Sequence, residues 1–301
     1  MICLVSNTNN PIENLAIEEY LLNNFSIDFL FIYQNTESII VGKNQIVAKE
    51  INNVFAFNQN FTIVRRLSGG GTVFHDLGNL NFSFIVNRKN GDNRIELFNS
   101  LIVKFIERVF SIELDTLENS IFYRDSKISG TAQYYKGQRQ IHHGTFLFNA
   151  DIVKLNESLK NKNYSNYIGN SQLSKKKCVS NFNSLVNKNL TFKGIIHDIS
   201  KYMKIFTLSD FILEKEGKNV KFNTVTIENR LREKEPAYIF ENSFTYNGSK
   251  KNICIKVRKN KIIEFASNCD FISGFQLIGS YHNFKLLNMI INDIELTSYF
   301  F

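Results

Sequence analysis

The chain of 301 residues carries a net charge of +8 at pH 7, and 43% of its residues are hydrophobic. This length fits one large domain, or a large domain with a small one, and the apolar content is sufficient for a sizeable core. The positive charge favours an acidic partner or a ligand that bears phosphate. Arginines do not gather on one face with interleaved aromatic residues, so we expect no bound nucleic acid.

The cysteines and the N-terminus indicate in which cellular compartment the protein is expected. Cysteines stand at positions 3, 178, 254 and 269, a spacing too wide for a zinc ribbon or a disulfide scaffold. Reduced thiols of a cytoplasmic protein are the simplest interpretation. Residues 1–10 lack the pattern of a signal peptide, and no stretch is long and apolar enough to span a membrane. We therefore predict a soluble cytoplasmic protein with no membrane association.

The first predicted element is a helix. Asn10 can cap it, Pro11 suits its first position, and Glu13 can reach back to the cap. Short apolar runs rich in Ile, Val and Phe then predict strands at residues 28–33, 38–42, 61–65 and 80–86. A second helix is expected over 96–110, with a buried stripe of Leu97, Leu101, Phe105 and Val109. Further strands are expected at 121–123, 128–132 and 143–148, and a helix at 192–206.

This order is not a repeated alternation of strand and helix, so a doubly wound parallel sheet is not expected. The elements fit an α+β fold in which helices flank a mixed β-sheet. Charged residues crowd into 229–236, and this shift in composition predicts a linker. The linker divides a large domain over 1–228 from a small α+β domain over 237–301. In the small domain, Asn247-Gly248 predicts a hairpin turn, and residues from Asn283 onward are spaced like a helix.

The most informative stretch is RRLSGGGTVFHD, at residues 65–76. Its three successive glycines let backbone amides approach a ligand closely, and N–H groups in such a loop can bind an anion. Arg65 and Arg66 add forked donors for a phosphate or a carboxylate. The alternative is a flexible hairpin loop with charges nearby by chance, because a glycine-rich loop alone is a weak indicator.

Two further motifs follow. Lys127 stands in KISGTAQ, where a single lysine on a strand is by default an exposed ammonium. His142 and His143 precede the apolar run 146–148 and raise the question of a metal. Adjacent residues of a strand point to opposite faces, however, and no acidic residue or cysteine lies at ligand spacing. We therefore do not expect the two histidines to hold a metal ion.

In this order, the strings RRLSGGGTVFHDLGNLNFSFI, KISGTAQ and HHGTFLFNADI closely resemble the lipoate–protein ligase A family of the biotin and lipoate ligase superfamily. NLAIEE at 14–19 agrees, and Pro236–Tyr238, the hairpin and Asp270-Phe271 match that family's small accessory domain. The resemblance covers nearly the whole chain. It implies an α+β catalytic domain that activates lipoate with ATP and Mg²⁺ to lipoyl-AMP. The lipoyl group then passes to a lysine of a carrier protein, either a glycine-cleavage H protein or a dehydrogenase E2 lipoyl domain.

The resemblance also implies roles for single residues. Lys127 would be catalytic and would meet both the phosphate and the lipoate carboxylate, where a fixed cation stabilises the charge that develops as pyrophosphate leaves. Ser68 and His75 would lie along the lipoyl channel, and the apolar strand Phe82–Phe84 is a candidate wall for it. The residues implied to bind ATP or the adenylate are Arg66, Gly71, Thr72, Val73, Phe74 and Lys127. No residue is assigned to Mg²⁺.

Two positions depart from the family pattern. Ser120 stands where members usually have an aspartate, and Asn181 stands where they often have an arginine. Related acyltransferases use a cysteine near 120–123, which has none here, and Cys178 is expected to be a buried structural thiol. The alternatives to a ligase are such a transferase, or a non-catalytic protein that binds lipoyl-AMP or lipoyl domains. Release of pyrophosphate separates an enzyme from a binder.

The segment 150–190 is rich in lysine and poor in large apolar residues at helical spacing. Its cations would repel one another around an empty site, and an adenylate phosphate would relieve that repulsion. We expect part of this segment to be mobile without ligand and to close over the reaction intermediate, which would exclude water. The alternative is a permanently disordered surface loop.

Overall fold

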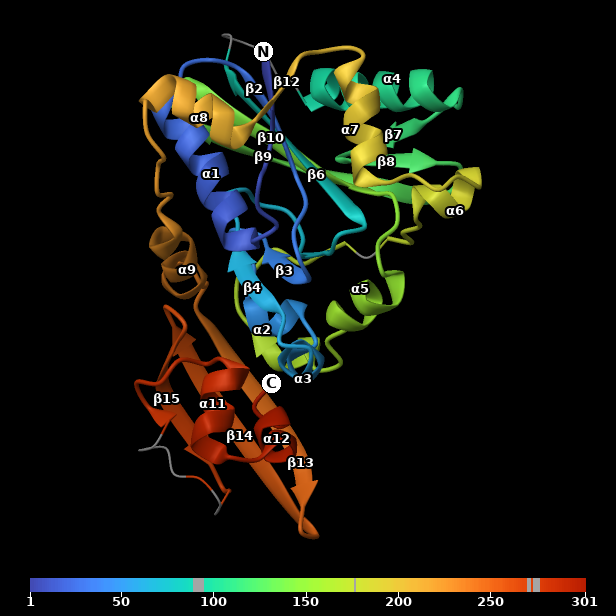
Figure 1. The fold of residues 1–301 in the computed structure, drawn as a ribbon. Helices are drawn as coiled ribbons and strands as arrows, with labels where there is room; N and C mark the ends of the chain where they lie inside the picture. The colour runs from blue at the N-terminus through green and yellow to red at the C-terminus, as the bar shows by residue number, and fades with distance from the viewer. Residues whose placement is uncertain (89–94, 176, 270–271, 273–276) are drawn as a thin grey trace.

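The computed structural model describes residues 1–88, 95–175, 177–269, 272 and 277–301. These residues form three β-sheets with helices packed around them (Figure 1). The predicted α+β class, with a mixed sheet flanked by helices, is confirmed. Among the described residues, no helix is long and apolar enough to cross a membrane.

The largest sheet has the strand order β12-β1-β2-β6-β10-β9-β8-β7. β1 pairs in parallel with β2 and β12, and the other neighbours are antiparallel. Its strands are β1 (Ile2–Val5), β2 (Phe29–Tyr33), β6 (Asn79–Asn87), β7 (Asp115–Leu117), β8 (Ser120–Tyr123), β9 (Ser126–Lys136), β10 (Arg139–Leu147) and β12 (Ile205–Thr207).

Helices cover both faces of this sheet. On one face, α4, α6 and α7 pack around an apolar core that includes Phe82 and Phe84. On the other face, α1 and α8 pack around a second core that includes Phe31 and Ile85. These helices are α1 (Pro11–Asn24), α4 (Ile95–Phe110), α6 (Phe182–Val186), α7 (Phe192–Ser200) and α8 (Leu208–Glu216). Alternate residues of β6 thus belong to different cores, as the pleat of a strand requires.

A second, three-stranded sheet carries the glycine-rich loop. Strand β3 (Ser38–Val41) pairs in parallel with β4 (Thr62–Arg65) and antiparallel with β5 (Val73–His75). The loop 66–72 connects β4 to β5, so strand pairing fixes both of its ends. The short helices α2 (Val47–Glu50) and α3 (Asn53–Asn58) lie between β3 and β4 in the chain.

Helix α1 begins at Pro11, as predicted. The side-chain oxygen of Asn10 accepts hydrogen bonds from the backbone N–H groups of Ile12 and Glu13, which satisfies donors that a helix N-terminus leaves free. The backbone N–H of Asn10 donates to Thr8 Oγ1 rather than to Glu13, so the reciprocal half of the predicted cap is replaced by a local turn.

Two predicted helices need correction. The helix expected over 192–206 ends at Ser200, and Ile205–Thr207 forms strand β12 because pairing with β1 satisfies its backbone at the sheet edge. In α4, Leu101 of the predicted stripe is 43% exposed, and the side chain of Leu97 lies outside the described part of the chain. The residues of α4 that the sheet buries are Phe98, Val103 and Ile106.

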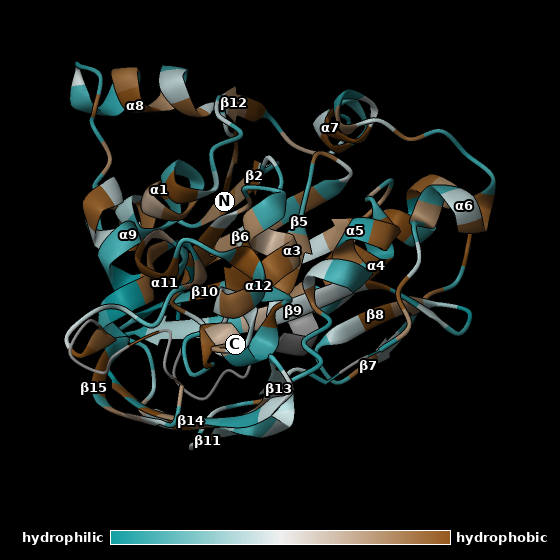
Figure 2. Ribbon diagram, turned by 90° about the horizontal axis from the view of Figure 1, so that it is seen from below, coloured by the Kyte–Doolittle hydropathy of each residue, from teal (hydrophilic) through white to brown (hydrophobic). Residues whose placement is uncertain are grey.

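The third sheet belongs to the C-terminal unit, which we define as residues 238–301. Its elements are β13 (Tyr238–Tyr246), β14 (Ser249–Arg258), β15 (Lys261–Ser267), α11 (Phe284–Ile291) and α12 (Ile294–Ser298). β13 also pairs with β11 (Tyr167–Ile168), so the sheet takes a strand from the preceding part of the chain. In Figure 2, α11 and α12 lie over this sheet, and Phe284 packs on Phe57 of α3 with 5.3 Å between ring centroids.

The segment predicted as a linker, 229–236, is anchored in the structure. Residues 229–233 belong to helix α9 (Thr224–Glu233), where Arg230 is buried and paired with Glu19. Glu235 is buried and paired with Arg65. Asp270 and Phe271, which matched the family's accessory domain, lie outside the described residues.

Candidate active site

A cleft of about 410 Å³ lies between the large sheet and the glycine-rich loop. It is lined by residues of α1, of the large sheet, of the three-stranded sheet, of the glycine-rich loop, and by residues 172–175 and 177. The predicted site residues that line it are Arg66, Gly71, Thr72, Val73, His75 and Lys127. The fold thus brings Lys127 to the loop although the two are far apart in sequence.

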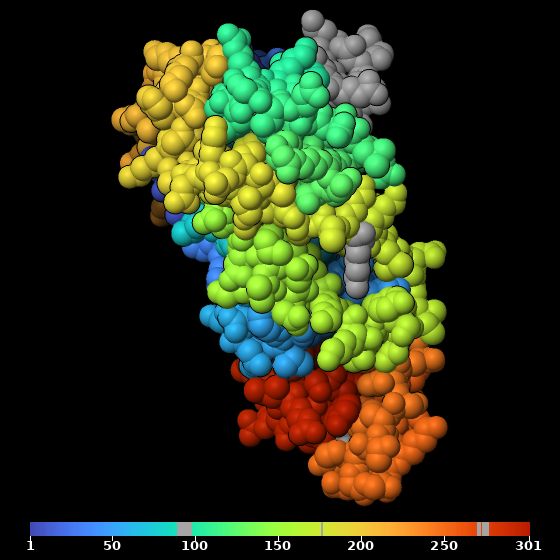
Figure 3. Space-filling model, turned by 90° about the vertical axis from the view of Figure 1, so that its right-hand side faces the viewer, coloured from blue at the N-terminus to red at the C-terminus, as the bar shows by residue number. Residues whose placement is uncertain are grey.

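A second cleft, of about 690 Å³, adjoins the first and shares Thr72, Val73 and Lys127 with it. Part of its wall comes from α5 (Ile152–Ser158) and the residues that follow. Phe74, predicted to bind the adenylate, lines this cleft and packs on Phe61. In Figure 3, the yellow-green residues of α5 and of the segment after it lie above the red and orange C-terminal unit. Lys127 stands where the two clefts meet.

Arg66 shapes the glycine-rich loop from within. Its Nε donates to Ser68 Oγ at 2.9 Å, and its Nη1 donates to the Ile40 carbonyl at 3.0 Å. Its Nη2 donates to the carbonyl oxygens of Gly69 and Gly71, at 2.7 Å each. Burial lowers the pKa of Arg66 to about 10, which leaves the side chain charged near neutral pH. By holding the loop carbonyls, the guanidinium leaves the loop amides to face other partners.

Side chains of the segment 172–174 occupy two of those amides. The backbone N–H of Gly70 donates to Gln172 Oε1 at 3.2 Å, and that of Thr72 donates to Ser174 Oγ at 2.9 Å. Such N–H groups are the donors that a phosphate accepts from. An anion that binds to the loop must therefore displace these side chains.

The ammonium of Lys127 lies over Gly130. Its Nζ is 3.0 Å from the position that a Cβ on Gly130 would take, so a larger residue there would displace it. Burial, together with the nearby ammonium of Lys177, lowers the pKa of Lys127 below its ordinary value. The structure records no hydrogen bond or ion pair to this Nζ among the described residues. Lys127 is thus a partly buried cation that is free to meet an anion.

Glu118 is the carboxylate among the described residues that line the first cleft. Its oxygens lie 3.2 Å from Lys175 Nζ and 3.7 Å from Lys177 Nζ, and hydrogen bonding to Lys175 lowers the pKa of Glu118. In the described part of the chain, no group of three or more His, Cys, Asp or Glu side chains could hold a metal ion.

A buried chain of hydrogen bonds fixes the tautomer of His75. Asn14 Nδ2 donates to Asn35 Oδ1 at 2.9 Å, so Asn35 Nδ2 is left to donate to His75 Nδ1, at 3.0 Å. The proton of His75 is therefore on Nε2, which has no partner among the described residues. Burial lowers the pKa of His75 to about 3, so the ring is neutral and keeps one unused N–H donor at the cleft.

A second chain of hydrogen bonds runs through Ser68. Its Oγ accepts from Arg66 Nε and forms a second hydrogen bond, with His143 Nε2, at 2.6 Å. His143 Nδ1 then donates to Glu18 Oε1 at 2.8 Å. Ser68 is buried and is not among the described lining residues of either cleft. It connects Arg66 to His143, which does line the first cleft.

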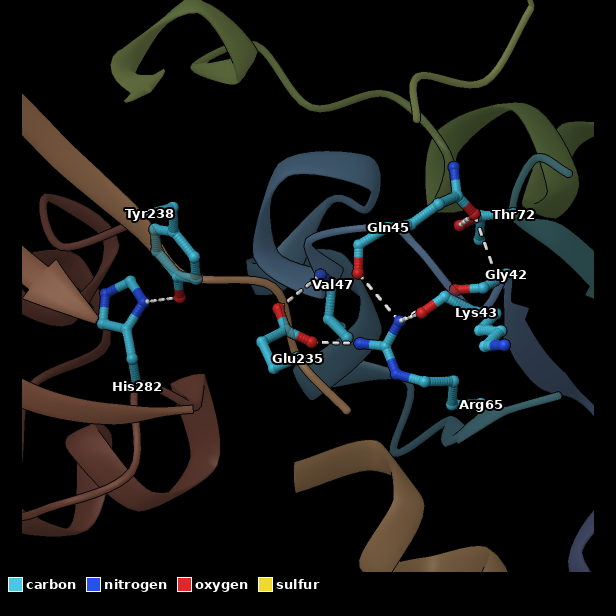
Figure 4. Close-up of polar contacts among 9 residues, drawn as sticks. All are labelled: Gly42, Lys43, Gln45, Val47, Arg65, Thr72, Glu235, Tyr238 and His282. Carbon is cyan, nitrogen blue, oxygen red and sulfur yellow. Dashed lines mark hydrogen bonds and ion pairs between the residues drawn. The ribbon is translucent and has the colours of Figure 1, made fainter. Parts of the chain in front are cut away.

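Arg65 reaches toward the C-terminal unit (Figure 4). It is fully buried, its Nη1 donates to the carbonyl oxygens of Gly42 and Gln45 at 2.8 Å each, and its Nη2 pairs with Glu235. Glu235 also accepts a hydrogen bond from the backbone N–H of Val47 at 2.8 Å. Burial raises the pKa of Glu235 to about 7, although the charge of Arg65 opposes this shift.

Gln45 carries this network to the glycine-rich loop. Its Oε1 accepts from Gly42 N at 3.0 Å and from Thr72 Oγ1 at 2.8 Å. Its Nε2 donates to Ser174 Oγ at 3.0 Å. The sequence analysis missed Gln45 and Glu235. The charges crowded before Pro236 were the only available indication, and they were interpreted as part of a linker.

Phe82 and Phe84 do not line the cleft that contains Lys127. They line a separate apolar cavity of about 340 Å³ on the face of the sheet covered by α4 and α7. The physical reason is the pleat of β6, which turns alternate residues to opposite faces. Asn81 lines the cleft instead.

The positions that depart from the family pattern have definite surroundings. Ser120 lines the first cleft. The side chain of Asn181 makes two hydrogen bonds to the backbone of Ala150. Asn181 Oδ1 accepts from the Ala150 N–H at 2.8 Å, and Asn181 Nδ2 donates to the Ala150 carbonyl at 2.7 Å. Cys178 is exposed, so the expectation of a buried thiol is wrong. Cys178 is attached to β9 through its backbone and not through its side chain, because its carbonyl accepts a hydrogen bond from the backbone N–H of Lys127 at 3.2 Å.

A family model described as the lipoyl protein ligase A/B catalytic domain matches residues 10–204. Lipoate–protein ligase 1 of Staphylococcus aureus is 32% identical over 320 residues, which cover 98% of this chain and 95% of that protein. The crystal structure of P. falciparum LipL1 in complex with lipoate has a TM-score of 0.58 at 22% identity, over 99% of this chain and 96% of that one. Lipoate–protein ligase A bound with ATP has a TM-score of 0.58 at 20% identity, over 74% of this chain and 98% of that one.

The family model spans the glycine-rich loop and Lys127, which meet in the first cleft. The staphylococcal relative extends the match over the C-terminal unit. The structural likenesses agree with these sequence matches in fold. The chain therefore belongs to the lipoate–protein ligase family.

Proposed function

We propose that this chain activates lipoate with ATP to form lipoyl-AMP and then transfers the lipoyl group to a lysine of a carrier protein. Family membership supports the class of reaction. The observation that carries the assignment of the site is the ammonium of Lys127, which lies where two clefts meet and has no partner among the described residues. Each cleft can then take one substrate, with the reacting groups at Lys127.

In the first step, a carboxylate oxygen of lipoate attacks the α-phosphorus of ATP, and the bond from that phosphorus to pyrophosphate breaks. Both reactants are anions, so their repulsion opposes the approach. The ammonium of Lys127 offsets this repulsion and stabilises the charge that develops on the phosphate oxygens. Because the cation is already held over Gly130, little reorganisation accompanies the reaction.

We assign the acyl chain to the smaller cleft, with His75 on its wall, and the nucleotide to the larger cleft, with Phe74 on its wall. Arg66 holds the loop in which Gly71, Thr72 and Val73 border the phosphate. Ser68 acts behind the wall by connecting Arg66 to His143. Magnesium enters with ATP as part of the substrate, bound to phosphate oxygens and to water.

In the second step, the amine of the carrier lysine attacks the acyl carbon, and AMP leaves with the electrons of the broken C–O bond. The carrier is a glycine-cleavage H protein or an E2 lipoyl domain. The net charge of +8 favours an acidic carrier surface. In this proposal residues 1–228 form the catalytic domain, and residues 237–301 form an accessory domain joined to it through 229–236. The segment 150–190 closes over lipoyl-AMP once it has formed.

The competing function is an acyl transfer through a cysteine thioester. No cysteine is among the described residues that line the two clefts, which favours the ligase. The test is to replace all four cysteines with serine, incubate the variant with lipoate, ATP and each candidate carrier, and measure pyrophosphate and carrier mass. We expect ATP-dependent lipoylation to persist. A thioester on Cys178 of the wild-type protein, or carrier modification that needs no ATP, would overturn the proposal.

A further inference from the structure

One row of residues crosses the large sheet beneath the first cleft. The register pairs Tyr33 with Asn81, and Asn81 with Thr145. It then pairs Thr145 with Gly130, and Gly130 with Ser120. All of these residues line the cleft. The row therefore forms the floor of the cleft, from β2 to β8.

The row also indicates how long an acyl substrate the cleft can hold. The ammonium of Lys127 lies over Gly130, near one end of the row. Gly130 and Asn81 are two strand spacings apart, which is about 10 Å. An eight-carbon acid whose carboxylate meets Lys127 extends across Thr145, and its far end then reaches Asn81.

Asn81 has hydrogen-bonding atoms that nothing in the described protein uses. Its side chain is 1% exposed, and neither Nδ2 nor Oδ1 has a partner among the described residues. Buried amides without partners are rare because they lose their bonds to water without replacement. Ser83, the next residue on the same face of β6, does bond to Glu18. Asn79, on the same face, donates through its Nδ2 to the Phe74 carbonyl and leaves only its Oδ1 unused. Among these neighbours, Asn81 is the one whose donor and acceptor are both unused.

We propose that Asn81 is a specificity-determining residue that recognises the far end of the acyl substrate and favours a sulfur-bearing ring over a plain methyl end. This inference rests on the proposed function. The amide N–H can donate to a dithiolane sulfur, which is a weak acceptor. A methyl end leaves both amide atoms buried and unpaired, and a site with unpaired polar groups rejects such an analogue. Weaker binding of octanoate then contributes more to the preference than stronger binding of lipoate does.

The test compares the wild-type protein with Asn81→Leu on lipoate and on octanoate. Leucine has a similar size and removes both polar atoms. We expect the lipoate-to-octanoate ratio of kcat/KM for pyrophosphate release to fall by about 3- to 10-fold, the range for one net hydrogen bond. The octanoate-to-lipoate ratio of dissociation constants, measured without ATP, should fall in parallel, mainly because octanoate binds more tightly.

The matched control is Asn87→Leu, the same change on the same strand at an exposed position outside the cleft. Its ratio should equal that of the wild type. An unchanged ratio in an active Asn81→Leu protein would overturn the role of Asn81 and leave the ligase standing. A wild-type protein that neither binds lipoate nor releases pyrophosphate would refute the proposed function as well. If leucine prevents folding, Asn81→Ala removes the same atoms and should give the same fall.

Discussion

The two faces of the large sheet have different surroundings, and the adjacent histidines of β10 illustrate the contrast. His142 stacks on Phe98 of α4 at 5.4 Å and has polar partners in Asn99 and Gln133, so protein atoms alone complete its surroundings. His143 lines the cleft on the other face. On that face, Lys127 and Asn81 keep atoms that have no partner among the described residues. His142 therefore contributes to the packing of the fold, whereas Lys127 and Asn81 keep atoms that a ligand can use.

The largest expected effect lies on the apolar face. Phe84 is buried and stacks on Phe98 at 4.8 Å. Phe84→Ala should lower the free energy of unfolding by about 3–5 kcal/mol, because it removes apolar contacts and leaves a cavity. Urea denaturation measures this loss, and the KM for ATP of the folded fraction should stay within about twofold, since distant sites behave independently. A small stability loss with a large change in KM would remove the distinction between the faces.

Lys127→Ala should have the next largest effect, now on activity. Losing a preorganised cation should slow pyrophosphate release by about 100- to 1,000-fold. Its melting temperature should match that of the wild type, because its Nζ has no partner to lose among the described residues. Lys136→Ala, at the exposed end of the same strand, is the control and should keep wild-type activity. Activity of Lys127→Ala within a few-fold of wild type would exclude it from the mechanism.

A smaller effect is expected for His142 and depends on pH. Burial lowers the pKa of His142 to about 3. Below pH ~6.5 the unfolded chain binds a proton that the folded protein does not accept until near pH 3, so stability falls as pH falls through this window. His142→Gln keeps a donor and an acceptor but removes the titration. Between pH 7 and pH 5 this variant should lose about 2 kcal/mol less than the wild type. Parallel pH profiles of the two proteins would contradict this account.

The smallest expected effect concerns Gln172. Its Oε1 accepts from the N–H of Gly70, one of the loop donors from which a phosphate can accept. Gln172→Ala should free this N–H and lower the KM for ATP by about two- to threefold, within the range for one exposed hydrogen bond. Gln172→Glu should raise the KM, because a carboxylate holds the amide more strongly and repels phosphate. Equal values in all three proteins would mean that this contact does not compete with ATP.

Features decided by a few neighbouring residues could be predicted from the sequence. Asn10 and Pro11 are enough to begin a helix, and the glycines after Arg66 are enough to suggest an anion site. Lys127 was identified through its motif, but that motif does not say that the ammonium would lie over Gly130 without a partner. That placement depends on the register of β9 and on its neighbours in the sheet.

Features that depend on the pairing of distant segments could not be predicted. β12 looks like the end of a helix until β1 is available to pair with it. The free N–H of His75 follows from Asn14 and Asn35, and no local pattern connects these residues. The same holds for Asn81, which appeared only as the polar member of an alternating strand. Its significance comes from the row of residues on four other strands.

The pairing of Arg65 with Glu235 has a consequence for how this protein can change over evolution. Arg65 ends the strand that leads into the glycine-rich loop, and its counter-ion, Glu235, lies just before the C-terminal unit. A chain that ended before Glu235 would leave a buried guanidinium uncompensated, which typically costs about 3–5 kcal/mol. A recombination that exchanged Glu235 together with the C-terminal unit would succeed only if the incoming segment brought a carboxylate to the same point. We therefore expect the two parts to be kept together in evolution, because Arg65 in one part needs the carboxylate of Glu235, although their sheets are separate.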